Sequence, residues 1–403
     1  MEKSMTITRA TQAQNNYQRN LKLIMAETIL TSIGAGFSVS TITDFWNSIG
    51  MDQTKIGLVQ MLYTVVVLLL DIPMGYIADR FNRKVLNIIG DIGIAIAFVF
   101  YAFSNNMYMA LAAECSLGFF TAMTSGVDQS FLKITAKKIN TSEEYFNKIT
   151  RDTFTAKYIA MFIVIFIGGF ISKISLRLAI GLSFLPYFIG GIVAFGIKDY
   201  GNRAEATITN PIKDMVINIK SLIKIPKVKL YAICYILGKE VTHSQIWVFT
   251  PLLEMCGVPM ELTCLGWMLN HLMQIVGAKF SKKMVNFKMS KKFMFPILIQ
   301  FTWLLVLIIH TNIITVWLFA LNGFVRGMAD SMLITPLQEE TKDELQTQVM
   351  SMASTGARLL YIPMVYFVNY LGKMKLELAL LGVLVVFLPL CLISYFKLKK
   401  MED

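Results

Sequence analysis

The sequence predicts an all-α membrane protein with twelve transmembrane helices, arranged as two pseudo-symmetric six-helix halves. Two observations come from composition: of 403 residues, 55% are hydrophobic and only 16% are charged, whereas a soluble domain has roughly a quarter of its residues charged. The third observation is that the apolar residues form long runs, and about 20 helical residues cross a bilayer core of about 30 Å. Backbone groups in lipid must bond within their own segment, so these runs are expected to be helices. The alternating ten-residue segments of a membrane β-barrel are absent.

The apolar runs divide the chain into twelve candidate spans, separated by short polar loops. In order, the expected spans are 22–46, 54–76, 84–103, 107–129, 150–171, 176–197, 229–252, 260–279, 293–310, 313–336, 348–371 and 376–396.

The distribution of Lys and Arg predicts the orientation of these spans. With the N-terminus inside the cell, 29 of the 38 basic residues fall in internal segments and five in external loops. Basic residues hold loops in the cytoplasm. Both termini are therefore expected to be cytoplasmic, in a multi-pass protein of the plasma membrane (the bacterial inner membrane). The net charge of +12 is explained by these loops and does not require a nucleic-acid partner.

A charged central segment divides the spans six and six. The expected organisation is an N-terminal half over 1–197, a cytoplasmic linker over 198–228 and a C-terminal half over 229–403. Within the linker, Asn210 and Pro211 form a helix-start signal, and apolar residues follow at helical spacing. This predicts a basic amphipathic helix on the inner leaflet; the alternative is a solvated linker. A weak repeat at an offset of 202 residues, from Gly75 to Gly277, also favours two related halves.

The loop after the second span carries the most specific motif, D-I-P-M-G-Y-I-A-D-R-F-N-R-K over residues 71–84. It resembles the signature loop G-x-x-x-D-R-x-G-R-K of the major facilitator superfamily, and the acid-x-Pro-x-Gly before it is similar to a bacterial efflux-like subgroup for drugs or metabolites. The resemblance implies alternating access, with a gating latch formed by Gly75, Asp79, Arg80, Arg83, Lys84 and Asp128. Asn82 replaces the motif glycine, and Asn tolerates the left-handed conformation that glycine adopts.

Some positions depart from the drug-exporter pattern. Glu114 stands where many drug exporters carry an Arg in the fourth helix, and Gly168-Gly169 is all that remains of the antiporter motif of the fifth. The superfamily is therefore better supported by the sequence than the drug-antiporter class.

Ionisable residues inside the expected spans are candidate site residues, because a charge in the bilayer is costly unless it faces a cavity or a partner. The resemblance implies that helices 1, 4, 7 and 10 line the transport path. The candidates for proton coupling or the substrate cavity are Glu27, Glu114, Lys157, Lys239, Glu240, Arg326, Asp330 and Arg358. Arg326 and Asp330 share a helix face, so simple pairing is the alternative for them. Asp71 and Asp91 are expected to belong to a structural network with the signature loop.

The sequence also excludes several classes of function. It has no G-x-x-x-x-G-K-[ST] nucleotide-binding loop, and its five cysteines lack metal-ligand spacing. No catalytic residues, metal or cofactor are expected, and the chain is not predicted to be an enzyme. The expected function is secondary active transport of a small molecule, as proton-coupled efflux, by a monomer. The alternatives are a proton symporter importing a small polar or anionic metabolite, and a membrane scaffold or sensor that transports nothing.

Overall fold

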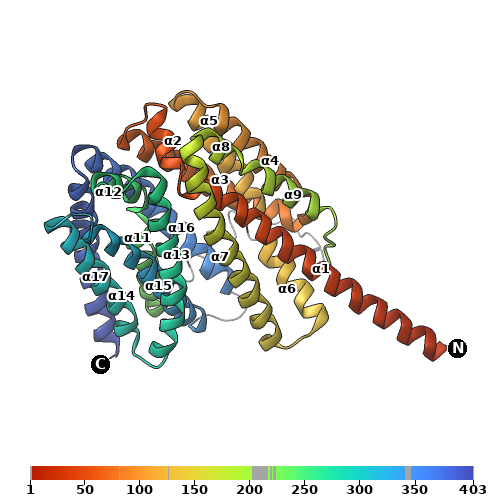
Figure 1. The fold of residues 1–403 in the computed structure, drawn as a ribbon. Coiled ribbons are helices and arrows are strands. Elements are labelled where there is room, and N and C mark those ends of the chain that lie inside the picture. Colours follow the sequence, from red (N-terminus) through yellow and green to blue (C-terminus); the bar gives the residue numbers. More distant parts are fainter. Residues whose placement is uncertain are drawn as a thin grey trace. The chain divides into compact units, whose positions relative to one another are not determined.

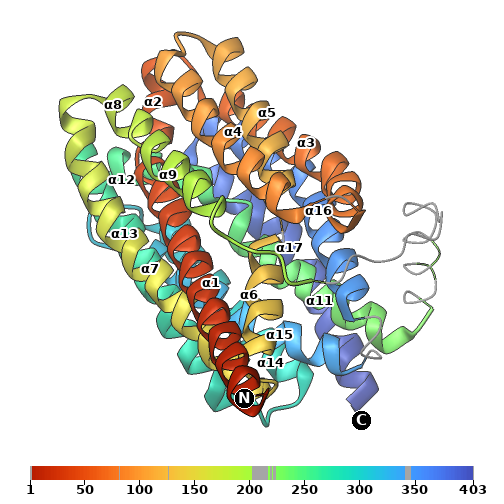
Figure 2. The same ribbon diagram turned by 90° about the vertical axis from the view of Figure 1, so that its right-hand side faces the viewer.

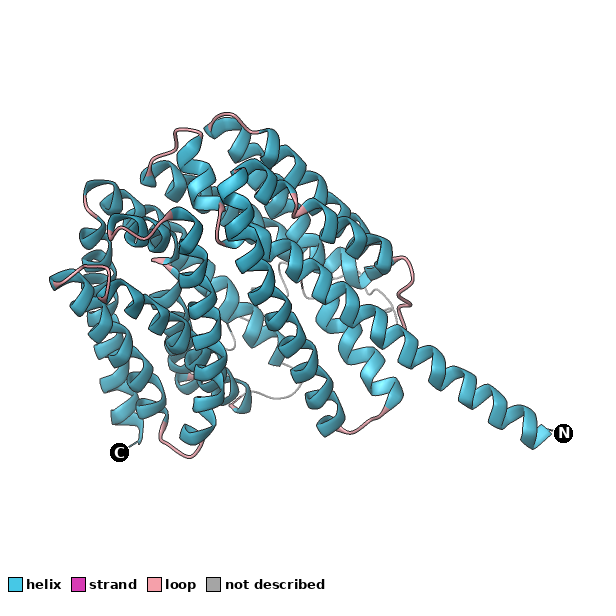
Figure 3. Cartoon of the chain, in the orientation of Figure 1, coloured by secondary structure: helices cyan, strands magenta, loops and turns pink. Residues whose placement is uncertain are grey.

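The computed structural model describes residues 2–80, 82–125, 127–201, 217, 220, 224–340 and 346–402. All secondary structure in these ranges is helical (Figure 3). For some residues inside helices only the backbone is described, and these include Gly75, Asp79, Arg80 and Asp128 of the signature motif. The predicted amphipathic helix of the linker lies almost entirely outside the described residues.

The chain forms two compact units. The first contains residues 1–41 and 69–208. Its helices are α1 (Glu2–Val39), the second part of α3 (Gln53–Arg80), α4 (Arg83–Phe103), α5 (Met107–Thr124), α6 (Val127–Ile139), α7 (Glu143–Ile174), α8 (Leu176–Gly181) and α9 (Phe184–Ala194). Within this unit α1 packs along α7 and α9 (Figures 1 and 2).

The second unit contains residues 42–68 and 209–403. Its helices are α2 (Ile42–Ser48), the first part of α3, α11 (Pro226–His243), α12 (Phe249–Met255), α13 (Thr263–Phe280), α14 (Met289–Ile309), α15 (Ala320–Glu339), α16 (Gln346–Met374) and α17 (Leu376–Glu402), with 3-10 turns η1 (Ile246–Val248), η2 (Met260–Leu262), η3 (Ser281–Met284) and η4 (Thr315–Phe319).

Residues 42–68 pack within the second unit, although the sequence expectation placed them in the N-terminal half. The rings of Trp46 and Trp247 lie 5.3 Å apart. The side-chain amide of Gln53 donates to the Trp247 carbonyl and to Asn369 Oδ1, both at 2.7 Å. Asp52 also lies 3.0 Å from Lys373 Nζ. These contacts explain why the start of α3 groups with η1 and α16.

Polar caps define where several helices begin. Asn106 accepts a hydrogen bond from the backbone N–H of Met109 at the start of α5, and Ser175 accepts from Leu178 at the start of α8. Such caps satisfy N–H groups that have no partner inside the helix. Asn82 caps α4 in the same way, with φ −102° and ψ 107°. Asn82 therefore stands at the motif glycine's position as an extended N-cap, and does not use the left-handed conformation that Asn tolerates.

Four expected spans are divided into separate α-helices among the described residues. The first is broken between α1 and α2 at residues 40–41, the fourth divides into α5 and α6, the sixth into α8 and α9, and the seventh into α11, η1 and α12. Pro186 and Pro251 each occupy the third position of their helix, in α9 and α12. Proline lacks an N–H and clashes with the carbonyl four residues earlier, so it kinks or breaks a helix that would run through it. At these two positions the preceding helix has ended.

In the second unit, helices α13 and α15 pack with their backbones very close together, and three glycines allow this approach. A Cβ added to Gly277, Gly323 or Gly327 would lie 1.9–2.0 Å from a carbonyl oxygen of the facing helix. Small residues of this kind let helices approach within a membrane. Seven of the described segments are long and apolar enough to cross a membrane.

Candidate functional site

A polar cavity of about 210 Å³ lies inside the first unit. Five helices contribute to it, and most of the residues that line it carry a hydroxyl or a charge. The lining residues are Thr31, Ser32 and Ala35 of α1, Asp91 and Ile94 of α4, Thr121 and Thr124 of α5, Lys157 and Met161 of α7, and Tyr187 of α9.

Glycines allow the helices around this cavity to approach one another. A Cβ on Gly34 of α1 would lie 2.4 Å from Cδ2 of Tyr187, and one on Gly191 of α9 would lie 2.7 Å from Cγ1 of Ile92. Larger residues would therefore force α9 away from α1 and α4. The glycines hold the Tyr187 ring and the Asp91 carboxyl beside α1.

Three hydroxyl groups of α1 and α5 in the cavity donate to their own helices. Ser32 Oγ donates to the Thr28 carbonyl at 2.6 Å, Thr31 Oγ1 to the Glu27 carbonyl at 3.2 Å, and Thr124 Oγ1 to the Thr121 carbonyl at 3.2 Å. Each hydroxyl has one hydrogen and two lone pairs. The oxygens therefore remain available as acceptors for a molecule that carries N–H or O–H donors.

Two charged side chains complete the cavity lining. Asp91 is buried, with 2% of its surface exposed, and Lys157 is half-buried. The Lys157 ammonium also lies 5.9 Å from the centre of the Phe154 ring. The cavity thus offers one carboxyl and one ammonium to a bound molecule. Asp91, which the sequence analysis expected in a network with the signature loop, lines the same cavity as Lys157.

The two glutamates of the first unit differ in their surroundings. Glu27, on α1, is buried and accepts a hydrogen bond from Asn87 Nδ2 of α4 at 3.4 Å. Asn87 is one helical turn from Asp91, so Glu27 lies next to the cavity. Glu114 of α5 accepts a hydrogen bond from the Tyr101 hydroxyl of α4 and is not among the residues that line the cavity.

A second polar cluster surrounds Glu240 in the second unit. Glu240 is buried, and its carboxyl lies 3.8 Å from Nδ1 of His243. The His243 ring stacks on Tyr361 with 4.3 Å between ring centres, and the Tyr361 hydroxyl accepts from Trp247 Nε1 at 2.8 Å. The cluster joins α11, η1 and α16.

A buried amide network lies next to this cluster. Asn322 Oδ1 of α15 accepts from the side chains of Gln245 and Gln300, each at 3.1 Å, and Gln300 Oε1 accepts from Trp303 Nε1 at 3.2 Å. This network was not predicted from the sequence, because amides carry no charge and the faces they occupy cannot be read from spacing alone. The available signal was the presence of three amide residues within the expected apolar spans.

The remaining charged candidates lie on α11, α15 and α16. Lys239 Nζ is 6.0 Å from the centre of the Tyr235 ring. Arg326 and Asp330 are half-buried, and no ion pair joins them in the described part of the chain. Arg358 is half-buried and lies near Tyr63 of α3. Helical spacing alone had suggested a pair between Arg326 and Asp330.

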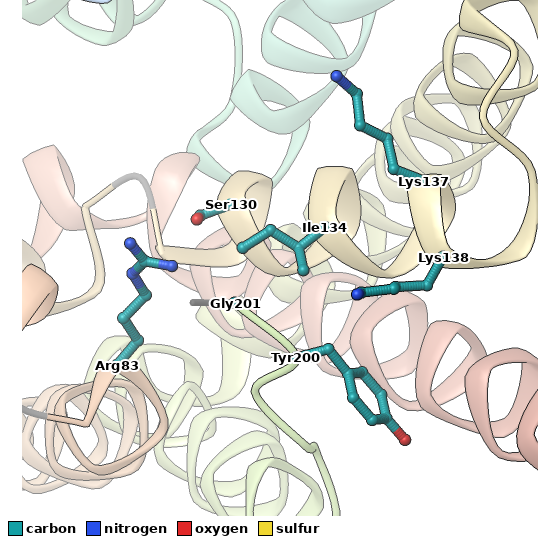
Figure 4. A pocket seen from close by; sticks show the side chains of 7 residues that line it. All are labelled: Arg83, Ser130, Ile134, Lys137, Lys138, Tyr200 and Gly201. Atoms are coloured by element: carbon teal, nitrogen blue, oxygen red, sulfur yellow. The ribbon is translucent and has the colours of Figure 1, made fainter. Parts of the chain in front are cut away.

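The basic end of the signature motif lines an open pocket of about 490 Å³ in the first unit. Figure 4 shows Arg83 from the start of α4, Lys137 and Lys138 from the end of α6, and Tyr200 from the segment after α9. Lys84 donates to the Phe195 carbonyl. The side chains of the other predicted latch residues, Gly75, Asp79, Arg80 and Asp128, are outside the described residues.

Among the described residues, no group of three or more His, Cys, Asp or Glu side chains gathers in a way that could hold a metal ion.

Comparisons with known proteins place this geometry in a family. A family model described as Major Facilitator Superfamily matches residues 25–364. An uncharacterized MFS-type transporter of Methanocaldococcus jannaschii is 25% identical over 183 residues, which is 45% of this chain and 40% of that protein. The match therefore spans less than half of that relative's length.

Solved transporter structures share the fold. A mutant of the nucleoside transporter NupG aligns over 95% of this chain and 100% of its own with a TM-score of 0.78 at 12% identity. A bacterial homolog of the human lysosomal transporter Spinster aligns over 96% of this chain and 97% of its own, with a TM-score of 0.74 at 12% identity. A mutant of the peptide transporter POT aligns over 94% of this chain and 93% of its own, with a TM-score of 0.71 at 13% identity.

These matches confirm the predicted family and fold class, a membrane protein of twelve transmembrane helices in two pseudo-symmetric halves. Its relatives are transporters. With a family model matched over most of its length, the chain belongs to the Major Facilitator Superfamily.

Proposed function

We propose that the chain is a secondary active transporter that exports a small polar molecule across the plasma membrane in exchange for protons. The observation that carries the proposal is the cavity of the first unit, where Asp91, Lys157 and hydroxyl oxygens surround about 210 Å³ of space next to buried Glu27. Charged groups inside membrane helices mark substrate and ion pathways.

The cavity chemistry supports a substrate with several polar groups. Hydroxyl oxygens whose hydrogens are already donated accept hydrogen bonds from the substrate, the Lys157 ammonium pairs with an anionic or strongly polar group, and the Asp91 carboxyl pairs with a donor. The same lysine also suits the alternative function, symport of a small anionic metabolite into the cell. The direction of transport distinguishes proton-coupled export from proton symport.

Proton coupling is proposed for the buried glutamates. A carboxyl that is dry in one state of the cycle and wetted in another changes its affinity for a proton between the two states. Glu27 and Glu114 are the first candidates in the first unit, and Glu240 and Asp330 are the next in the second. The proposed topology has both termini in the cytoplasm, and the proposed transporter is a monomer.

Gating is proposed for the signature motif, from its resemblance to the family. Gly75, Asp79, Arg80, Arg83 and Lys84, together with Asp128, would stabilise one state of the cycle. Asp79→Asn is expected to slow transport and to leave membrane insertion unchanged, because it removes a latch and not a span. Wild-type transport by a well-folded Asp79→Asn protein would contradict the latch.

The test uses inverted membrane vesicles with an imposed pH gradient and a panel of small polar compounds. Uptake of a compound with release of vesicle protons is the expected result for export. Proton movement in the opposite sense, or accumulation only in right-side-out vesicles, would favour the symporter.

The coupling residues are tested with the compound that the panel identifies. Glu27→Gln is expected to abolish accumulation against a gradient while downhill exchange of that compound continues. Asp152→Asn on α7 is the matched control, because Asp152 is exposed and pairs only with neighbouring Arg151 among the described ion pairs. Normal accumulation in both Glu27→Gln and Glu114→Gln would place the proton site elsewhere.

A further inference from the structure

A groove on the second unit shares no residue with the transport cavity proposed above. Its volume is about 570 Å³, and it lies between the end of α13, η3, the start of α14 and the end of α17. The lining consists of seven apolar or aromatic residues and two lysines: Phe280, Met284, Phe287, Met294, Phe295, Leu298, Tyr395, Lys283 and Lys291.

The apolar wall of the groove is open to its surroundings. Leu298 is 52% exposed, Phe287 46% and Phe295 39%. Leu298 and Phe295 lie on α14, a helix long and apolar enough to cross a membrane. The groove therefore runs from the membrane-spanning part of α14 toward its N-terminal end, where a hydrocarbon chain can lie against it.

The two lysines stand at the polar end of this wall and each lies over an aromatic ring. Lys283 Nζ is 5.4 Å from the centre of the Phe280 ring, and Lys291 Nζ is 5.8 Å from that of Phe287. Cation–π contacts of this length orient an ammonium group. Long basic side chains at helix ends cover apolar surface with their stems while the charge stays at the interface. Two cations thus flank the mouth of an apolar groove.

The surrounding charge is strongly positive. Residues 279–292 contain six lysines and no acidic residue. One carboxylate, that of Glu402 of α17, contacts this segment by accepting hydrogen bonds from the backbone N–H and the hydroxyl of Ser290. Glu402 thereby caps the N-terminus of α14, and this end of the helix is not a vacant anion site.

From these observations we infer that the groove binds an anionic phospholipid of the inner leaflet. The acyl chain lies along the Phe295 and Leu298 side of the groove, and the phosphate lies between Lys283 and Lys291. Basic pockets between membrane helices on the cytoplasmic side suit anionic head groups, and the predicted orientation places residues 279–292 on that side. A soluble anion would pair with the lysines but leave the apolar wall exposed. An anionic lipid pairs with the lysines through its phosphate and covers the apolar wall with its acyl chain.

The test measures lipid retention by the full chain in detergent, using native mass spectrometry with equal amounts of phosphatidylglycerol and phosphatidylethanolamine. The wild-type protein is expected to retain phosphatidylglycerol preferentially. The double variant Lys283→Gln/Lys291→Gln should bind it about 30-fold more weakly, because each lysine near a lipid surface contributes about 1 kcal/mol.

The matched control is Lys282→Gln/Lys288→Gln, which removes the same charge from the same segment at exposed positions that do not line the groove. Its affinity for phosphatidylglycerol is expected to change less than about threefold. All variants are surface changes, and thermal unfolding checks that they fold.

Three results would overturn the inference. An equal loss in the control variant would mean a diffuse charge effect without a site. Equal retention of phosphatidylglycerol and phosphatidylethanolamine would mean that the groove is a hydrophobic surface that binds acyl chains without recognising the head group. Displacement of phosphatidylglycerol by millimolar inorganic phosphate, with no effect of Phe295→Ala, would mean a phosphate site in place of a lipid site.

Discussion

The contact between α13 and α15 gives the sharpest stability prediction. Gly327 faces the Gln274 carbonyl, and a Cβ at this position would lie 2.0 Å from that oxygen. An ordinary Cβ contact begins at 3.4 Å, so Gly327→Ala requires the two helices to separate locally by about 1.4 Å. Gly323 faces the Asn270 carbonyl in the same way, at 1.9 Å.

The loss of stability in Gly327→Ala depends on which neighbouring atoms must move to make room for the new Cβ. Overpacking a core costs about 1–3 kcal/mol when side chains can adjust. Here the obstacle is a backbone carbonyl, which cannot rotate away, so the cost lies at or above the upper end of that range. We therefore expect Gly327→Ala to lower the free energy of unfolding by about 3 kcal/mol or more.

The measurement is thermal unfolding of the purified protein in detergent. The matched control is Gly356→Ala on α16, where the new Cβ would lie 2.6 Å from Cδ1 of Ile236, the free end of a side chain that can change rotamer. Gly327→Ala and Gly323→Ala should unfold well below the wild type, and Gly356→Ala close to it. If all three unfold at the same temperature, the close backbone approach of α13 and α15 is refuted.

Three further changes have defined outcomes. Asn20→Ala should destabilise the protein by about 2–4 kcal/mol in thermal unfolding, because buried Asn20 makes three hydrogen bonds, to the Thr135 hydroxyl and to both backbone groups of Lys198, each worth about 0.5–1.5 kcal/mol. Asp52→Asn should change stability by less than about 1 kcal/mol, because its ion pair with Lys373 is exposed. Burial by itself raises the pKa of Asp52, but the Lys55 N–H and the Lys373 ammonium outweigh it and hold the pKa below its usual value. The small difference in stability between the wild type and Asp52→Asn is thus present above about pH 4 and disappears at lower pH. A large difference in stability at pH 7 would contradict this expectation. In a background with the native cysteines replaced, Ser142→Cys should react only with reagent admitted to the cytoplasm and Ile313→Cys with reagent outside; the reverse pattern would overturn the orientation.

Local signals in the sequence predicted much of the helical arrangement. The starts of α5 and α8 agree with the expected spans at Met107 and Leu176, because Asn106 and Ser175 are short polar residues that cap a helix. The signature motif led to the family through residue identity. The interruptions at Pro186 and Pro251 were missed, because an apolar run looks continuous in hydropathy even where proline ends a helix.

The polar sites were harder to predict, because they depend on which helix faces meet. Lys157 and Asp91 are 66 positions apart and come together only through the packing of α4 against α9 and of α7 against α1. The capping role of Asn82 was also not predicted, because this position was interpreted only through the motif glycine that Asn82 replaces.

One helix, α3, is shared between the two compact units, with Leu68 the last residue of one part and Leu69 the first of the other. Pro73 lies inside this helix. It has no N–H, so the carbonyl of Leu69 cannot form the usual bond four residues along. A bend at this point breaks fewer hydrogen bonds than a bend elsewhere in α3, and prolines are where sharp helix kinks occur. One of the three places where the chain crosses between the units, at residues 68–69, therefore lies in the turn of α3 that lacks a backbone hydrogen bond.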